Sequence, residues 1–174
     1  MLLAACLFSG CGSGVTKSAK TFPSGEKATA GALIYSVVDV HIVPRLGDDP
    51  TTARTPKDRF FLIKISASNS SANEVSIPSL TLIDDHGKVF SEVADGTNVP
   101  DWLGVLRKIE PGQTGDGVVI FDAPSQHYRL RLTDETDEDI GIDIPLTFVN
   151  ESAEPATPPF DPGAQPIQIP RNKE

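Results

Sequence analysis

The chain has 174 residues, an ordinary apolar content and a formal net charge of −9 at pH 7. This length suits one domain with extensions at its ends. Contacts with nucleic-acid phosphates need clustered lysine and arginine, so the acidic balance argues against DNA or RNA as a partner. The sequence also contains no Gly-x-Ser-x-Gly motif, which leaves a serine hydrolase site with little support.

The first part of the chain indicates export rather than a fold. Its first ten residues are apolar and small, as at the end of a secretory signal, and are too few to span a bilayer. Phe8-Ser9-Gly10-Cys11 resembles the bacterial lipobox, whose cysteine becomes the lipidated first residue of the mature protein. Leu3-Ala4-Ala5-Cys6 resembles it too. Two apolar residues follow Cys6, however, whereas a flexible glycine- and serine-rich stretch follows Cys11. We therefore expect acylation at Cys11, with Cys6 in reserve; a plain cleaved signal or a membrane-segment fragment is the alternative.

Composition divides the chain into four parts. Residues 1–11 are the signal end with the lipobox, and residues 12–30, rich in Ser, Thr, Lys and Gly, are predicted as a flexible linker. Residues 31–148 form the predicted domain, which lacks cysteine and so can hold neither a disulfide nor a thiolate metal site. Residues 149–174 contain six prolines and are predicted as a disordered tail, although such segments also bind aromatic grooves.

Short strands separated by turn residues fill the predicted domain. Apolar and polar side chains alternate in most of them, which is typical of strands with one buried face. The predicted strands are residues 32–43, 59–68, 75–77, 80–83, 89–90, 118–123, 128–132 and 140–146. Residues 84–88 should form a hairpin turn, residues 100–106 a single helical turn, and Pro145 should place the last strand at an edge.

A turn and a strand within residues 109–124 organise this pattern. Gly112 follows a proline and supplies the positive φ of a type II turn. Gly115 and Gly117 predict a bulge or a close backbone approach. Residues 118–121 are continuously apolar, which favours a central strand covered on both faces. A phosphate-binding loop is disfavoured because a strand follows instead of a helix.

Together these features predict an all-β protein, an immunoglobulin-like two-sheet antiparallel sandwich without a disulfide. Hydrophobic packing alone must then hold the sheets together. Phe61, Trp102 and Phe121 are the first candidates for the core.

Few residues of the sequence could take part in catalysis or metal binding. His41 lies on the polar side of its strand, and His86 and His127 lie in turns, without the close spacing of a metal site. Copper is further disfavoured because Met1 is the only methionine. Thiol catalysis is excluded if Cys11 is acylated. We therefore expect no cofactor, no catalytic residue and no enzymatic activity; a hydrolase with an unrecognised site is the weaker alternative.

An acidic run near the end of the domain offers a weak Ca²⁺ site. Carboxylate oxygens are the ligands that Ca²⁺ prefers, but the order of an EF-hand loop is absent. A solvated, charged loop is the simpler interpretation. The candidate ligands are Asp134, Glu135, Asp137, Glu138 and Asp139.

Three segments in order resemble a known family. They are Phe60-Phe61-Leu62-Ile63-Lys64-Ile65 followed by Asn69-Ser70; Leu82-Ile83-Asp84-Asp85-His86-Gly87-Lys88-Val89-Phe90; and Ile109-Glu110-Pro111-Gly112-Gln113-Thr114-Gly115 leading to Val119-Ile120-Phe121-Asp122-Ala123-Pro124. They resemble the telokin-like, immunoglobulin-fold domain of bacterial lipoproteins, a family of unknown function that is similar to secreted mycobacterial antigens. The resemblance implies a secreted or lipid-anchored β-sandwich, and it implies no activity, cofactor or catalytic residue.

The sequence therefore favours a lipoprotein of the bacterial cell envelope, held to the membrane through its N-terminal lipid. Because the domain shows no evident chemistry, we expect it to bind or scaffold another protein. The alternative is a secreted ligand- or Ca²⁺-binding protein that uses the acidic run.

Overall fold

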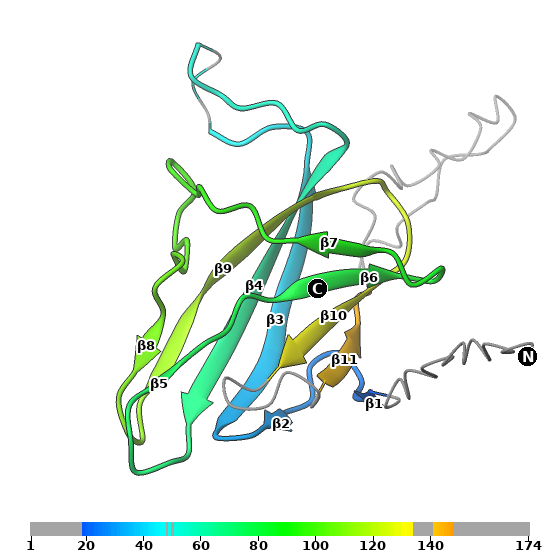
Figure 1. Ribbon diagram of the computed structural model, residues 1–174. Coiled ribbons are helices and arrows are strands. Elements are labelled where there is room, and N and C mark those ends of the chain that lie inside the picture. Colours follow the sequence, from blue (N-terminus) through cyan, green and yellow to red (C-terminus); the bar gives the residue numbers. More distant parts are fainter. Residues whose placement is uncertain (1–18, 48, 50, 134–140, 148–174) are drawn as a thin grey trace, which may run out of the picture.

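The computed structural model describes residues 19–47, 49, 51–133 and 141–147. Two main sheets pack face to face (Figure 1). The first has the order β1 (Lys20–Thr21), β11 (Gly141–Pro145), β10 (Tyr128–Thr133), β6 (Thr81–Asp84) and β7 (Val89–Ser91). The second has the order β2 (Ala28–Ala30), β3 (Leu33–Val43), β4 (Arg59–Asn69) and β9 (Thr114–Ala123). A small pair joins β5 (Val75–Ser76) to β8 (Lys108–Ile109).

The predicted all-β sandwich is confirmed, and the described residues contain no cysteine that could form a disulfide. Strand β4 shows the alternation that predicted it, because Phe61, Ile63 and Ile65 are at most 1% exposed and face the other sheet. An aromatic contact joins the sheets here: the ring of Tyr128 meets Phe61 edge-on at 5.2 Å between centroids and Phe90 at 5.5 Å. Such pairs stabilise a core beyond simple burial.

Tyr128 also closes the turn before β10. Its hydroxyl donates a hydrogen bond to the carbonyl oxygen of Pro124 at 2.7 Å, as in the tyrosine corner of immunoglobulin-like sandwiches. Burial raises the pKa of this hydroxyl to about 12. The side chain therefore stays a neutral donor throughout the physiological range.

Strand β9 was predicted to be central, and this is wrong: it lies at the edge of the four-stranded sheet. Both of its faces are nevertheless covered, as its continuous apolar run predicted. A loop replaces the missing neighbour, because the Leu103 N–H donates to the Val118 carbonyl at 3.0 Å and the Val118 N–H donates to the Asp101 carbonyl at 2.8 Å. A Cβ on Gly117 would lie 2.8 Å from the Asp101 carbonyl oxygen, which confirms the predicted close approach.

Other boundaries also differ from the prediction. The predicted linker 12–30 ends too late, because β1 and β2 lie within it and Ala28 and Ala30 are fully buried. The predicted helical turn at 100–106 is wrong, since Asp101 and Gly104 have positive φ values of 57° and 76° that no right-handed helix accepts.

Two further predictions are partly right. Strand β11 is not at the sheet edge, but β1 pairs only with Ile142 and Asp143, so the side of Pro145 carries no strand in the described part of the chain. Phe61 and Phe121 are core residues, as predicted, whereas Trp102 packs in a second, outer cluster.

Asn69 ties together two of the turns that the family resemblance contained. Its side-chain amide donates to the carbonyl oxygens of Asn73 at 2.7 Å and Ile109 at 2.9 Å, and its side-chain oxygen accepts the Ser71 N–H at 2.8 Å. Its own carbonyl accepts the N–H of Gly112, whose φ of 72° confirms the predicted turn. Each buried polar group here has a partner, which fixes both turns.

Asp84 organises the hairpin between β6 and β7 in a similar way. One carboxylate oxygen accepts the N–H groups of His86 at 2.9 Å and Lys88 at 2.8 Å, and the other accepts the Gln126 side-chain amide at 3.0 Å. Gly87 supplies the predicted positive φ, 81°. Burial raises the pKa of Asp84, but these hydrogen bonds outweigh it and hold the pKa below its ordinary value of 3.8.

This depressed pKa makes the contribution of Asp84 to stability depend on pH. The ionised carboxylate stabilises the fold above the ordinary pKa, and that contribution is lost as pH falls through the lower folded-state value. We expect Asp84→Asn to destabilise the protein at pH 7 and the difference from wild type to narrow below about pH 4. Urea unfolding at several pH values measures this. Asp85→Asn is the matched control, because its side chain is 69% exposed; an equal effect of both variants would contradict the assignment.

Candidate functional site

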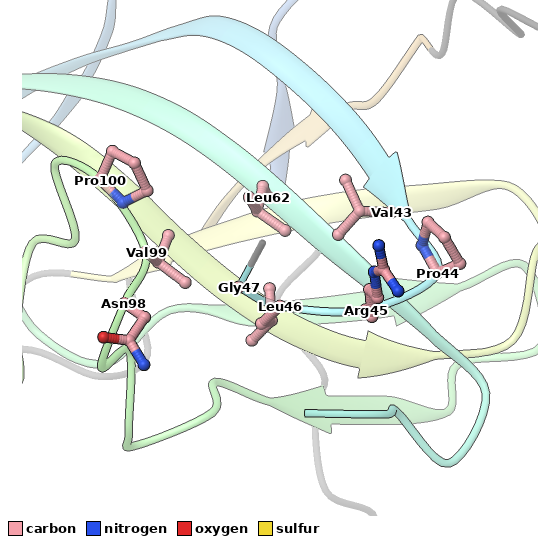
Figure 2. A pocket seen from close by; sticks show the side chains of 9 residues that line it. All are labelled: Val43, Pro44, Arg45, Leu46, Gly47, Leu62, Asn98, Val99 and Pro100. Carbon is pink, nitrogen blue, oxygen red and sulfur yellow. The ribbon is translucent and has the colours of Figure 1, made fainter. Parts of the chain in front are cut away.

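A pocket of about 340 Å³ opens on the outer face of the four-stranded sheet. Leu62 of β4 forms its base, the end of β3 and the residues after it (43–47) form one wall, and residues 98–100 form the other. Figure 2 shows the side chains of Val43, Leu46, Leu62 and Val99 around the space, with Arg45 and Asn98 at opposite sides. The lining is therefore mainly apolar, with one cation and one amide.

The pocket lies in a second apolar cluster, outside the core between the sheets. Buried side chains from β4, β9 and the two loops form this outer cluster. They are Leu46, Phe60, Val99 and Ile120, with Val43, Leu62, Val93, Trp102 and Val118 partly buried beside them. The sequence contained a signal for it, because Phe60 and Leu62 are apolar on the side of β4 that otherwise carries Lys64 and Ser66. Alternation alone assigned that side to solvent, so the site was missed.

Polar contacts hold the two pocket loops together. Leu46 and Arg54 exchange backbone hydrogen bonds at 2.9 and 2.8 Å. The Arg54 guanidinium then donates to the Asp95 carboxylate at 3.0 Å and to the Asp95 carbonyl at 2.7 Å. A single exposed ion pair stabilises little. Together, however, these contacts set the spacing of the two walls before any ligand arrives, which lowers the cost of binding.

The second wall has an unusual backbone. Asn98 and Asp101 are the non-glycine residues with positive φ in the described chain, at 66° and 57°. Asn and Asp tolerate this conformation best, and such residues cluster at ligand-binding sites. Gly96 is required for a different reason: a Cβ there would lie 2.1 Å from the Trp102 ring. The positive φ values and the close contact between Gly96 and the Trp102 ring together determine the shape of the second wall.

A buried ion pair between Glu92 and Arg107 joins the two ends of the segment that contains the second wall, residues 98–100. The side chains of Arg107 and Glu92 are only 3% and 7% exposed, and the guanidinium bonds both carboxylate oxygens. Glu92 also accepts the Leu80 N–H, and Arg107 donates to the Gly104 carbonyl. With its hydrogen bonds satisfied in this way, the pair fixes where the segment leaves and rejoins the sheets.

We expect Arg107→Met to destabilise the protein by about 3–5 kcal/mol, because it leaves the Glu92 carboxylate buried without its cation. Replacing both partners, with Arg107→Met and Glu92→Leu, should recover part of that loss. The free energy of unfolding in urea measures both effects. Arg54→Met removes an exposed ion pair and should cost about 1 kcal/mol or less. A loss for Arg107→Met no larger than for Arg54→Met would disprove the role of the buried pair.

The side chains that line the pocket are apolar apart from one guanidinium and one amide. Its lining residues include no carboxylate, histidine or thiol. Among the described residues, no group of three or more His, Cys, Asp or Glu side chains is placed to hold a metal. His41, His86 and His127 are exposed, as predicted. No helix in the part of the chain that the structure covers is long and apolar enough to cross a membrane.

The site residues predicted from sequence cannot be placed. Cys11, Cys6 and the candidate Ca²⁺ ligands Asp134, Glu135, Asp137, Glu138 and Asp139 lie outside the described residues. The lipid anchor and the Ca²⁺ site therefore stay predictions.

The pattern of the family described as "Domain of unknown function (DUF4352)" matches residues 22–141. The chain belongs to the DUF4352 family. The match begins before β2, in agreement with the corrected domain boundary. The predicted resemblance to a lipoprotein family of unknown function is thereby confirmed. Among curated proteins, none matches the chain significantly.

Solved structures share this β-sandwich fold at low sequence identity. The yjhA protein of Bacillus subtilis is 21% identical, with a TM-score of 0.56 over 72% of this chain and 98% of that one. The candidate lipoprotein ycdA of the same species is 12% identical, with a TM-score of 0.55 over 71% and 38%. The secreted protein MPT63 of Mycobacterium tuberculosis is 13% identical, with a TM-score of 0.53 over 72% and 98%. At these identities the likeness shows the fold alone.

Proposed function

We propose that this DUF4352 protein is a lipid-anchored protein of the bacterial cell envelope whose sandwich binds another protein through the outer-face pocket. The pocket carries the proposal, because it is an apolar cavity between two walls that are fixed in advance. Its volume of about 340 Å³ lies at the small end of the range of roughly 300–1,000 Å³ for ligand sites. It suits one apolar side chain of a partner better than a large cofactor.

The charge at the rim of the pocket indicates which kind of protein partner would bind there. Arg45 is the charged residue among those that line the pocket. An apolar anchor seated in a small pocket supplies most of the energy at protein interfaces, and a neighbouring charge pair adds specificity. The partner should therefore present a large apolar side chain beside an acidic one.

The proposed location rests on the sequence before the domain and on the relatives. The segment that ends at Cys11 resembles a lipobox, and the chain enters the sandwich at β1 only nine residues later. Among the structures that share the fold are a candidate lipoprotein and a secreted protein. Both features support a domain outside the cytoplasm.

Intact-protein mass spectrometry tests the anchor. Produced in a bacterium that processes lipoproteins, the mature chain should begin at Cys11 and carry the added mass of acyl groups. Cys11→Ser should abolish that mass, whereas Cys6→Ser should leave it unchanged. An unmodified mature chain, or acylation that depends on Cys6, would refute the assignment of Cys11.

Site-specific photo-crosslinking in intact cells tests the pocket. A photoreactive residue in place of Pro100, which lines the pocket and is exposed, should crosslink to an envelope protein, and Val43→Phe should reduce that product at least tenfold because the ring fills the cavity. Val89→Phe on β7 is the matched control, since Val89 is 55% exposed in the other sheet. A product unaffected by Val43→Phe, or equally reduced by Val89→Phe, would exclude the pocket as the binding site.

A further inference from the structure

Strand β3 has a long edge that no described strand occupies. Strand β2 pairs with β3 only at Leu33, Ile34 and Tyr35. On its other side β3 pairs with β4 up to Val43. The edge from Ser36 to Val43 therefore has no neighbouring strand among the residues that the structure places. Figure 1 shows β3 continuing well beyond the end of β2. An open edge presents backbone donors and acceptors that can pair with another strand.

The open edge is limited at both ends. A β-bulge shifts the register with β4 between Val37 and Asp39, so that Val38 lies outside the regular ladder. Pro44 follows the strand and has no N–H to donate. The regular part of the edge is thus Asp39 to Val43, a length that admits one short strand and resists extended growth.

The sequence of this edge is complementary to itself. If Val40 lies opposite Val40 of a second, antiparallel copy, Asp39 lies opposite His41 of that copy. Asp39 and His41 are exposed, with side chains 51% and 64% accessible. Each Asp39 carboxylate then meets a His41 imidazole, and the two Val40 side chains meet each other. Directly opposite pairs of these kinds stabilise antiparallel strands.

From this pattern we propose that two copies of the protein pair through the β3 edges, in an antiparallel register centred on Val40. A twofold axis at Val40 makes the contact closed, because each copy uses the same β3 edge and none of that edge is left for a third copy. The two four-stranded sheets then become one continuous sheet of eight strands. A partner with another sequence would have to reproduce the same alternation, whereas the second copy supplies it.

In the single chain, the polar groups of the edge are satisfied locally. The Asp39 carboxylate accepts the Val40 N–H at 2.8 Å and lies 2.8 Å from Nε2 of His41. Pairing exchanges these contacts for equivalent ones across the twofold axis, so the net gain is modest. The net charge of −9 on each copy also opposes association. We therefore expect a weak dimer in solution.

Membrane attachment would compensate for this weakness. A short tether confines copies to one surface and raises their effective concentration toward the millimolar range. This step rests on the proposed lipid anchor, whereas the pairing itself does not. The pairing can therefore be tested in solution on a chain without lipid, so that its failure and a failure of the anchor are separate results.

Sedimentation equilibrium of the full chain with Cys6→Ser and Cys11→Ser tests the proposal, because neither acylation nor a disulfide can then join copies. We expect a monomer–dimer equilibrium at concentrations up to about 1 mM. His41→Glu places like charges opposite each other and should weaken the dimer at least tenfold, as should Asp39→Lys. The double variant with both changes restores opposite charges and should regain the association. Lys88→Gln, at an exposed turn, is the control for net charge and should leave it unchanged.

Single cysteines in the same background test the register. Under mild oxidation, Val40→Cys should form an intermolecular disulfide faster than Asp39→Cys or His41→Cys, because only position 40 lies opposite itself. Circular dichroism checks that each variant is folded. A chain that stays monomeric up to about 1 mM, a double charge variant that does not recover, or fastest crosslinking at 39 or 41 would each overturn the proposal.

Discussion

Strands β4 and β9 carry apolar side chains on both faces, and the outer part of the structure depends on this constraint. The inner residues face the second sheet, while Phe60, Leu62 and Ile120 face outward. Outward apolar side chains on a sheet must be covered, because their exposure costs roughly 25 cal/mol for each Å². No helix in the described chain does this, so the loop between β3 and β4 and the segment between β7 and β8 cover them. The pocket lies at the junction of the two loops.

The loops need polar support because they have few regular hydrogen bonds of their own. The buried pair of Arg107 and Glu92 supplies it at one end of the second loop, and the contact of Arg54 with Asp95 joins that loop to the first. These contacts are energetically unequal, since the first is buried and the second is exposed. The buried pair therefore determines whether the wall forms, whereas the exposed pair adjusts its position.

The sequence predicted the parts that depend on local chemistry. Alternation identified the core face of β4, and the glycines at 87 and 112 marked the turns in which they have positive φ. Parts that depend on distant neighbours were missed. Strand β9 is continuously apolar because a loop covers it, and the sequence cannot distinguish that loop from a neighbouring strand. Strand β2 was missed because Ala-Thr-Ala has small side chains that give little hydrophobic pattern. The pocket was missed for a related reason. Leu62 becomes part of a pocket only because two loops, distant from it in the sequence, meet above it.

The three segments that resembled the family largely build the scaffold. Asn69, Gly112 and the hairpin at Asp84 each hold turns, and none of them lines the pocket. Apart from Leu62, the lining residues lie outside those segments, at the end of β3 and in the two loops. A shared fold with different loops is the usual way in which one scaffold serves many ligands. Members of the DUF4352 family can therefore share this sandwich and still differ in what they bind.

The chain enters at β1 in the five-stranded sheet, whereas the pocket and the open edge of β3 belong to the four-stranded sheet. An N-terminal tether would thus join the layer opposite to both binding features, so that anchoring does not compete with either of them.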